Sequence, residues 1–579
     1  MAPQYMRSAP EWILHQQANT GIQPETNRAR MHTECYPISI LPGTSALFRD
    51  FAEAQDAATV RRLRKWYPAD PFRMDWAHSA PVLSETHRTR LADELLGQAD
   101  VFAAGPAARA NIERLRTGAA AVVTGQQVGL FGGPLLTLLK AATAIRKAQD
   151  ATRASGREHV PVFWLASEDH DVAEVDHLYL PGKTQVERVE ADVAVHGLAV
   201  PAGSLRTGPH VDAALSSVEE LLAFAPICDL LRNAYSDHDR YTATMASGFG
   251  RLISQVFAEQ GLVVMDASTR GFHALGRETL RAAIERAEDL EQALLERSAE
   301  LEGAGYHAQV KVAAEMSLLF LVSPAGQGIS ERRALRRTAD GNWKAGPRSF
   351  STADLLEILE SEPERLSPNA LLRPVFQDAI LPSAAYVGGP AEIAYFAQSA
   401  VVYEKILGRV TAVLPRLSAT LVEPAVGKVL GQHEVHFPQL LEAKTAEELS
   451  VRLGARSMPI EAKRRLSAAG SALDEEMTAL LEYMNAMSPE LGRAAGVSAS
   501  KMRYQMNRLR RMAARFQLER EASLRKHANA VMLSLFPDEH LQERLLGGVW
   551  FLARLGEDLP KLLVEHAGQE CPGHRVLFL

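Results

Sequence analysis

A dense group of ionisable residues directly follows one apolar run of the chain. Residues 160–166 (VPVFWLA) have the pattern of a buried strand, and Glu168, Asp169, His170 and Asp171 come immediately after it. Charged side chains at the end of a buried strand are costly unless they have partners or a task. Asp169 and His170 are therefore candidates for general acid–base catalysis, for binding a substrate amine, or for holding a divalent metal ion. The alternative is an acidic loop in which Asp171 caps the next helix.

A glycine-rich loop follows another apolar run, at 119–125 (AAAVVTG). It contains Gly125, Gly129, Gly132 and Gly133 and leads into a segment with the pattern of a helix. Glycine permits a close approach of the backbone to a ligand, and the N-terminus of a helix favours an anion. The loop is neither a Walker loop nor a GxGxxG motif. It predicts an anion or nucleotide site, and the alternative is a tight strand-to-helix turn without a ligand.

A third candidate lies at the end of the run 383–389 (SAAYVGG), where Tyr386, Gly388 and Gly389 are followed by Glu392. A carboxylate in the first turn of a helix can hold a substrate hydroxyl or amine, or it can simply favour the helix dipole. The carboxyl ends of parallel strands lie on one edge of a sheet, so the three loops can meet at one crevice. Their convergence predicts an α/β enzyme with an anionic or nucleotide-like ligand.

The elements that would position these loops alternate between short apolar runs and helical segments. The runs lie at 119–125, 160–166, 261–267, 317–323, 383–389 and 411–417. Strand, helix and strand in this order predict a parallel sheet with right-handed crossovers, with a helix at 135–149. On that helix, Lys140 is expected to be a solvated charge. Residues 31–120 are predicted to be mainly helical, 186–195 to form a hairpin, and 272–302 to form one long charged helix.

The chain divides into four parts by its pattern. They are a disordered extension at 1–30, a Rossmann-like α/β core at 31–425, a helical coiled-coil region at 426–533, and a return to the core at 534–579. Within the core we expect insertions at about 180–310 and at 324–350. The second insertion is rich in Gly, Arg, Ser and Pro, which predicts a mobile surface loop.

The coiled-coil region has a heptad pattern in two segments separated by Ser488-Pro489. Their apolar positions step by four and three residues and are Leu473, Met477, Leu480, Met484 and Met487 in the first segment and Met502, Met506, Leu509, Ala513 and Phe516 in the second. This spacing predicts an antiparallel α-helical hairpin. Its apolar seam could close on itself or on a partner subunit.

Composition excludes several classes of protein. The 579 residues are 46% hydrophobic and 23% charged, with a formal net charge of −7, which is typical of a globular protein and argues against a dedicated nucleic-acid binder. No apolar run approaches the roughly 20 residues of a membrane span, and the first residues lack the order of a signal peptide. We therefore expect a cytoplasmic protein. Cys35, Cys228 and Cys571 lie far apart, which predicts neither a disulfide framework nor a metal knuckle.

Three long motifs closely resemble the signatures of the BshC family, to which the cysteine-adding step of bacillithiol biosynthesis is assigned. They are TGQQVGLFGGPLLTLLK (124–140), PVFWLASEDHDVAEVDH (161–177) and SPNALLRPVFQDAILPSAAYVGGPAEIAYFAQ (367–398). PRLSATLVE (415–423) and LQERLLGG (541–548) are weaker matches, and the resemblance runs from about Tyr36 to near the C-terminus.

The resemblance implies a core related to class I aminoacyl-tRNA synthetases and a homodimer formed through the coiled coil. It also implies that L-cysteine is joined to glucosaminyl-malate as an amide, with ATP and magnesium activating the carboxylate as an adenylate. Asp169 and His170 would be catalytic, and Glu168, Asp171, Tyr386, Gly388, Gly389 and Glu392 would bind substrate. The nucleotide would be held by Thr124, Gly125, Gln126, Gln127, Gly129, Gly132 and Gly133.

Two departures from the synthetase pattern bear on that mechanism. No KMSKS-type lysine loop follows the last predicted core strand, and Arg416 and Ser418 are the candidates to replace it. No thiolate-rich zinc site is present to recognise a cysteine thiol, so no metal site is predicted. Two other functions stay open, namely an ATP-dependent amide ligase acting on another amine and acid, and a non-catalytic dimeric scaffold that binds a metabolite.

Overall fold

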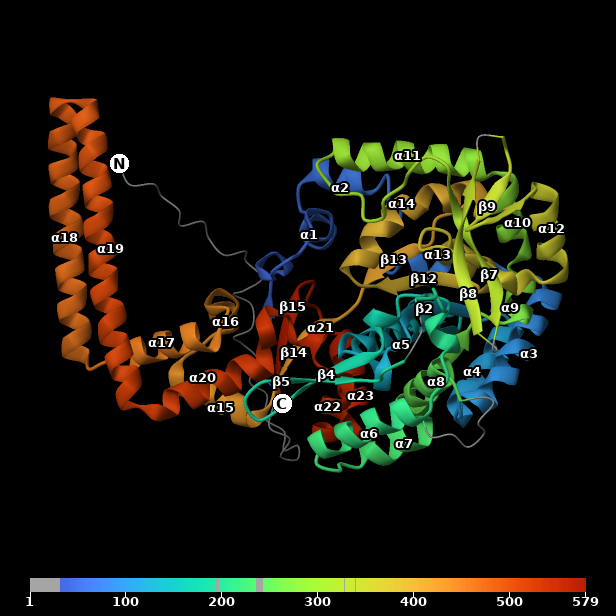
Figure 1. Cartoon of the computed structure of the whole chain (residues 1–579), viewed down its shortest axis with the longest axis horizontal. Helices are drawn as coiled ribbons and strands as arrows, with labels where there is room; N and C mark the ends of the chain where they lie inside the picture. Colours follow the sequence, from blue (N-terminus) through green and yellow to red (C-terminus); the bar gives the residue numbers. More distant parts are fainter. Residues whose placement is uncertain (1–31, 194–196, 236–242, 327–328, 339) are drawn as a thin grey trace.

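The structure is a computed structural model that describes residues 32–193, 197–235, 243–326, 329–338 and 340–579, so the predicted extension at 1–30 lies outside the described residues. Figure 1 shows a body of strands and helices from which one long helical hairpin projects.

Five of the six apolar runs form one parallel sheet, as predicted. Its strands, in order across the sheet, are β13 (Ala412–Pro415), β12 (Ser383–Gly388), β2 (Ala120–Gln127), β3 (His159–Ala166) and β6 (Val263–Asp266). Neighbouring residues of β2 join different hydrophobic clusters, since Val123 packs in one and Val122 in another. Both faces are therefore covered, which explains the continuous apolar run. The helix α5 (Leu136–Ser155) connects β2 to β3, which confirms the predicted helix.

The sixth run, 317–323, does not belong to this sheet. It lies in β7 (Met316–Gly326), which is paired antiparallel in a separate sheet of order β10-β9-β8-β7-β11. The remaining strands are β8 (Ile329–Arg337), β9 (Trp343–Ala345), β10 (Arg348–Phe350) and β11 (Leu366–Pro368). The prediction of a loop at 324–350 is therefore wrong. Despite their polar composition, these strands bury Leu335 and Trp343, which hold them against the core.

The predicted helical region before the sheet is confirmed. Its elements are the short strand β1 (Thr33–Tyr36) and the helices α1 (Ala46–Glu53), α2 (Ala57–Leu63), α3 (Glu85–Val101) and α4 (Pro106–Thr117). Ser45, Asp56 and Ser84 cap α1, α2 and α3 by accepting backbone N–H groups. The helices pack their apolar faces on the side of the sheet that carries Val123 and Val160.

The segment between β3 and β7 is a hairpin followed by helices, with the central-sheet strand β6 between the third and fourth of the helices named below. β4 (His177–Pro181) and β5 (Val186–Glu190) form the hairpin, and the helices are α6 (Pro209–Leu221), α7 (Ile227–Tyr235), α8 (Met245–Val256), α9 (Arg270–Leu275), α10 (Arg277–Glu285) and α11 (Ala287–Gly303). The hairpin thus begins earlier than the predicted 186–195. The single helix predicted at 272–302 is wrong, because the chain breaks at Gly276, where a Cβ atom would lie 2.2 Å from the Phe376 ring.

The C-terminal part returns to the body and pairs with its first strand. After α12 (Thr352–Ser361), α13 (Arg373–Ile380) and α14 (Pro390–Leu407), its elements are β14 (Ser418–Val422), α15 (Pro424–His433), α16 (Phe437–Ala443), α17 (Ala446–Ser457), α18 (Ile460–Met487), α19 (Pro489–Arg520), α20 (Ala522–Leu535), α21 (Gln542–Leu545), α22 (Gly548–Leu555), α23 (Asp558–Ala567) and β15 (His574–Phe578). β15 lies between β1, which is antiparallel to it, and β14, which is parallel. None of the described helices is both long and apolar enough to span a membrane.

The helices α18 and α19 form the predicted antiparallel hairpin, which projects from the body (Figure 1). Only part of the predicted seam is covered within it. Met477 is buried, whereas Leu480, Met502, Leu509 and Phe516 are 42%, 48%, 53% and 61% exposed. The residues buried in the two helices include small ones such as Gly470 and Ala499, whereas larger apolar side chains stay exposed along both helices.

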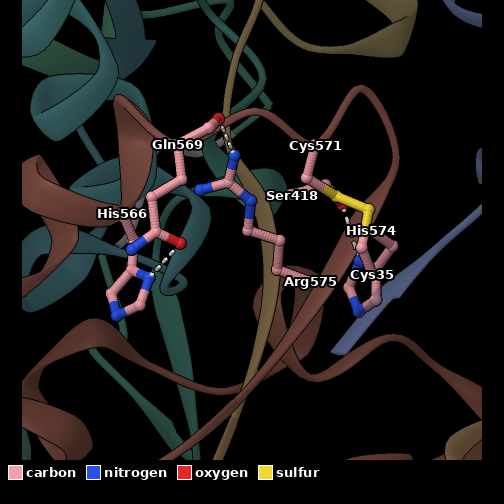
Figure 2. Close-up of a disulfide and its surroundings, with 7 residues drawn as sticks. All are labelled: Cys35, Ser418, His566, Gln569, Cys571, His574 and Arg575. Carbon is pink, nitrogen blue, oxygen red and sulfur yellow. Dashed lines mark hydrogen bonds between the residues drawn. A yellow bond between two sulfur atoms is a disulfide. The ribbon is translucent and has the colours of Figure 1, made fainter. Parts of the chain in front are cut away.

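Cys35 and Cys571 form a disulfide although 536 residues separate them in the chain (Figure 2). The expectation of no disulfide is therefore wrong. The pairing of β1 with β15 brings the two cysteines together, because Cys35 lies opposite Arg575 and Cys571 lies in the turn before β15. Cys228 is a free, buried thiol.

Candidate active site

A cavity of about 850 Å³ lies at the carboxyl ends of β2, β3 and β12. The three predicted motifs meet there, as the order of the strands requires. The predicted site residues that line it are Gly125, Gln126, Gln127, Glu168, Asp169, His170, Tyr386, Gly389 and Glu392. The position of Gly125 needs glycine because a Cβ atom there would lie 2.8 Å from the Trp164 carbonyl oxygen.

The second half of the glycine loop does not line the cavity, contrary to its predicted role. Leu135 N–H donates to the Leu546 carbonyl at 2.8 Å, and Gly548 N–H donates to the Gly133 carbonyl at 3.0 Å. Residues 546–548 therefore cover this half of the loop. Gly129, Gly132 and Gly133 belong to a buried turn, so the cradle proposed for a nucleotide is reduced to residues 125–127.

Three further predicted residues lie outside the cavity wall. The Thr124 hydroxyl is buried and donates to the Val387 carbonyl at 2.8 Å, which ties β2 to β12. Gly388 is the last residue of β12, and it does not line the cavity, although the next residue, Gly389, does. Asp171 is exposed, and although it occupies the cap position of a short 3₁₀ helix (Val172–Glu174), its side chain accepts no capping hydrogen bond. Neither interpretation of Asp171 is therefore supported.

Lys140 is the main residue of the site that sequence reasoning missed. It is buried, not solvated, and its Nζ lies 2.5 Å from Glu392 Oε2, 2.7 Å from the Gly125 carbonyl and 2.9 Å from Gln126 Oε1. Burial alone would raise the pKa of Glu392, but Lys140 and the Gly389 N–H override it and hold that pKa below its usual value. A single Lys within the apolar run LTLLKAATA was the signal that could have identified it.

Aromatic residues and an arginine extend this ion pair. The Tyr386 hydroxyl donates to Glu392 Oε1 at 2.5 Å, and burial followed by the Glu392 charge raises the pKa of Tyr386 well above its usual value. Arg373 lies 5.3 Å above the Tyr386 ring and donates to the Tyr395 hydroxyl at 3.2 Å. These contacts hold the Lys140–Glu392 pair in place at the carboxyl ends of β2 and β12.

Asp169 lines the same cavity and stays accessible. Its Oδ2 accepts from Gln127 Nε2 at 2.7 Å, its Oδ1 accepts from the His170 backbone N–H at 2.8 Å, and its side chain is 39% exposed. Gln127 also donates to Glu174 at 2.8 Å. Asp169 is therefore an oriented carboxylate without a tight ion-pair partner, as a proton acceptor needs to be.

His170 is oriented by Arg332. The guanidinium Nη1 lies 3.1 Å from His170 Nδ1, and because arginine only donates, this nitrogen must be unprotonated. A neutral His170 therefore carries its proton on Nε2 and acts as a donor. Arg332 is itself fixed by Ser367 Oγ at 3.0 Å and by the Phe320 ring at 3.7 Å. It comes from the segment predicted to be a loop.

Glu168 points to the buried side of the cavity. Burial would raise its pKa, but His273, whose Nε2 lies 3.5 Å from Oε1, and Arg332 hold the pKa of Glu168 below its usual value.

Six basic side chains line the cavity against four acidic ones. The basic residues are Lys140, Lys311, Arg332, Arg373, Arg416 and Arg544, and the acidic residues are Glu168, Asp169, Glu174 and Glu392. The surplus suits an anionic ligand. Within the described ranges, no three His, Cys, Asp or Glu side chains lie close enough together to hold a metal ion.

Arg416 and Ser418 do not form a mobile substitute for a lysine loop. Arg416 is buried in an ion pair with Glu543 at 2.6 Å, and Ser418 Oγ lies 3.1 Å from Glu543 and 2.8 Å from His574 Nδ1. Arg416 and its neighbours hold the pKa of Glu543 at about 2, although burial would raise it. Burial lowers the pKa of His574 to about 4. These residues join β14 and β15 to the cavity wall.

This arrangement predicts a loss of stability in mild acid. A histidine whose folded pKa lies below its unfolded value stabilises the fold above the unfolded value and loses that contribution as the pH falls. Between about pH 7.5 and pH 5, His574 should account for about 2 kcal/mol of the decrease in the free energy of unfolding. Denaturant titrations at both pH values should show a smaller decrease in His574→Gln. An equal decrease in the wild-type protein and the variant would contradict the assignment.

Comparisons with known proteins agree with the three motifs. Residues 31–417 match the model of the bacillithiol biosynthesis BshC N-terminal Rossmann-like domain, and residues 419–579 match that of the C-terminal coiled-coil domain. Two relatives are each named "Putative cysteine ligase BshC". The one from Koribacter versatilis is 41% identical over 94% of this chain and all of its own length, and the one from Solibacter usitatus is 33% identical over 95% and 100%.

A solved structure, described as a putative arginyl-tRNA synthetase from Campylobacter jejuni, aligns with 83% of this chain and 98% of its own at 10% identity. Its TM-score of 0.22 is too low to indicate a shared fold. The two family models together match nearly all of the described chain. The chain therefore belongs to the BshC family of bacillithiol biosynthesis.

Proposed function

We propose that the protein is a cytoplasmic ligase that joins L-cysteine to the amine of glucosaminyl-malate, forming a carbon–nitrogen amide bond at the expense of ATP. The observation that carries the proposal is the pairing, in one cavity, of an accessible carboxylate at Asp169 with a basic surplus. The names of the relatives support a cysteine ligase. ATP with magnesium would activate the cysteine carboxylate as an adenylate with release of pyrophosphate, and the amine would then displace AMP.

The charge of the cavity fits both proposed substrates. Glucosaminyl-malate carries two carboxylates and ATP carries phosphates, so both are anions that a basic cavity attracts. Lys311 and Arg544 line it without an ion pair among the described side chains, and they are the cations most available to such groups. Gly125, Gln126 and Gln127 present the backbone end of β2 to the same space.

Two side chains would each handle one proton of the reaction, Asp169 as the acceptor and His170 as the donor. The amine of the substrate must lose a proton as it attacks, and Asp169, held by Gln127 and the His170 backbone, accepts it. His170 donates from Nε2 to the oxygen on which negative charge develops, because Arg332 occupies Nδ1. Lys140 and Glu392 line the same cavity, where they would position the activated acid.

A genetic experiment tests the function in the cell. In a strain that has this chain as its only family member, deletion should abolish bacillithiol and leave glucosaminyl-malate to accumulate, and the wild-type gene should restore the thiol. Normal bacillithiol in the deletion strain would refute the proposal. With purified protein, a higher kcat/KM for another amine or acid than for these two substrates would show a ligase of different specificity.

We further propose that two copies associate through the open apolar surface of the α18–α19 hairpin. Leu480 and Leu509 are 42% and 53% exposed, so replacing either by Asp should cost a single chain little stability. In a dimer the new charge would be buried without a partner, which is costly. Light scattering should therefore show a monomer for Leu509→Asp with an unchanged circular dichroism spectrum. A dimer that persists in both variants would place the interface elsewhere.

A further inference from the structure

The segment that connects α11 to β7 has no regular secondary structure and passes along the active-site cavity. It comprises residues 304–315 and is here called the α11–β7 segment. Val310 and Lys311 line the cavity, as does Met316 at the start of β7. Because this wall belongs to the cavity of the proposed ligase, its role rests on the function proposed above.

The two ends of the α11–β7 segment are anchored to the rest of the chain. Near its start, Tyr306 is 4% exposed and its hydroxyl donates to Asp50 Oδ2 at 2.6 Å. At its end, the Glu315 backbone N–H donates to Glu291 Oε1 at 3.0 Å. Residues 311–314 between these anchors are mostly exposed, so apolar packing contributes little to holding them. Their position depends on hydrogen bonds to the preceding backbone.

Gln398 supplies these hydrogen bonds from the middle of α14. It is fully buried, its Oε1 accepts from the Val310 N–H at 2.8 Å, and its Nε2 donates to the Val310 carbonyl at 2.8 Å. Nε2 also lies 3.2 Å from Ser298 Oγ, on α11, which packs against α14 (Figure 1). One side-chain amide thus pairs with both backbone groups of a single residue, as residues of adjacent antiparallel strands do. The two bonds fix the peptide groups on both sides of Val310.

Packing alone does not explain a glutamine at this position. Its neighbours one turn away on α14, Ala394 and Val402, are apolar and buried. Burial of an amide without hydrogen-bond partners costs roughly 1–3 kcal/mol, so Gln398 depends on Val310 for its partners. An apolar side chain would fill the same helix face without that requirement. The glutamine therefore indicates a need to hold the backbone at Val310, although Gln398 itself does not line the cavity.

The residue that this contact places in the cavity wall is Lys311, which directly follows Val310. Lys311 forms no ion pair among the described side chains. Each of the four acidic side chains that line the cavity already has another partner. Lys140, by contrast, is occupied by Glu392 at 2.5 Å. The charge of Lys311 is therefore available to a ligand.

We propose that Lys311 binds an anionic group of one substrate, a carboxylate of the acceptor or a phosphate of the nucleotide, and that Gln398 is the positioning residue for it. Because Val310 is held by two hydrogen bonds, Lys311 starts from a restricted backbone and loses less conformational freedom when its ammonium group meets the anion. Without Gln398, Lys311 keeps its charge but loses this restriction. The effect therefore falls on the affinity for that substrate and not on the chemical step.

Equilibrium binding to the full-length chain tests the role of Lys311. Isothermal titration calorimetry in the absence of L-cysteine measures the affinities for glucosaminyl-malate and for ATP with magnesium separately, without turnover. Lys311→Met should weaken the binding of one ligand about tenfold and that of the other less than twofold. The weakened ligand identifies the source of the anionic group. Lys311→Arg keeps the charge and should retain most of the affinity.

Gln398→Leu tests the positioning role. It should weaken the binding of the same ligand about threefold or more and leave the other ligand unaffected. In steady-state kinetics, Gln398→Leu and Lys311→Met should both raise KM for that substrate while kcat stays within about twofold. Ser298→Ala is the matched control, because it removes the third contact of the Gln398 amide and leaves both bonds to Val310 in place. It should change neither affinity.

The two parts of the proposal fail on different results. Lys311→Met that leaves both affinities unchanged, or lowers both equally through a general loss of positive charge, would overturn the role of Lys311; this side chain is exposed, so its variant should fold. Gln398→Leu with the wild-type circular dichroism spectrum and unchanged affinities would show that the glutamine only holds the segment. Wild-type protein that binds neither ligand would instead refute the proposed function, and this role of Lys311 with it.

Discussion

Lys140→Met should give one of the two largest effects of any single substitution in this protein, because it leaves a buried carboxylate without its cation. Glu392 keeps its charge through Lys140, and the two side chains are only 17% and 4% exposed. Removing one partner of a buried ion pair typically costs about 3–5 kcal/mol of stability. Loss of a positioned cation from the cavity should also lower kcat/KM about 10²–10³-fold. Denaturant titration and steady-state kinetics measure the two effects separately.

The double variant Lys140→Met, Glu392→Gln distinguishes the two roles. With both charges removed, no unpaired ion stays buried, so most of the lost stability should return. The ligase activity should stay low, because the cation is still missing. Activity that recovers together with stability would show that the pair only holds β2 and α14 together. Lys147→Met, seven residues further along the same helix and outside the active-site cavity, is the matched control and should keep its activity.

Asp169→Asn is the second substitution with a large expected effect, and it should reduce turnover far more than stability. The carboxylate is 39% exposed, and an amide has one acceptor oxygen, which keeps the contact with either Gln127 or the His170 backbone and loses the other, so the stability should fall by only about 1 kcal/mol. Loss of the proton acceptor should lower kcat about 10²–10⁴-fold. A comparison of kcat, KM and the thermal unfolding midpoint with those of the wild-type protein checks this expectation.

Glu174→Gln is the matched control for Asp169. Both carboxylates accept from the same Gln127 amide, at 2.8 and 2.7 Å, and both line the cavity, but Glu174 is exposed and follows the strand end by eight residues. If the role of Asp169 is chemical, Glu174→Gln should keep kcat within a few-fold of the wild-type value. Equal losses in the two variants would mean that the cluster acts only through its overall charge.

The central sheet and the meeting of its loops were predictable from local patterns. β2, β3 and β12 are covered on both faces, and strands of that kind have continuous apolar sequences. Their polar residues had to come at the strand ends, so the position of Asp169, His170 and Glu392 at one edge followed from the parallel order. The heptad helices were predictable for the same reason, because their periodicity is a local property of the sequence.

The remaining features depend on long-range pairing that local patterns do not encode. The run 317–323 is as apolar as the others, and its composition does not reveal that its neighbour is the antiparallel β8. Arg332 was missed because its strand is as polar as a loop. The disulfide joins residues 536 positions apart, through strands that pair only in the folded chain. The burial of Gly129–Gly133 depends likewise on the distant segment 546–548.

The most direct test of the central claim is mass spectrometry of the purified protein incubated with L-cysteine and glucosaminyl-malate, with and without ATP and magnesium. Cys35 and Cys571 should be kept in a defined state, and Asp169→Asn serves as the blank. We predict an amide product with the mass of bacillithiol that forms only when the nucleotide is present and is almost absent with the variant. No product above the Asp169→Asn blank from folded wild-type protein would contradict the assignment of this cavity as the ligase site.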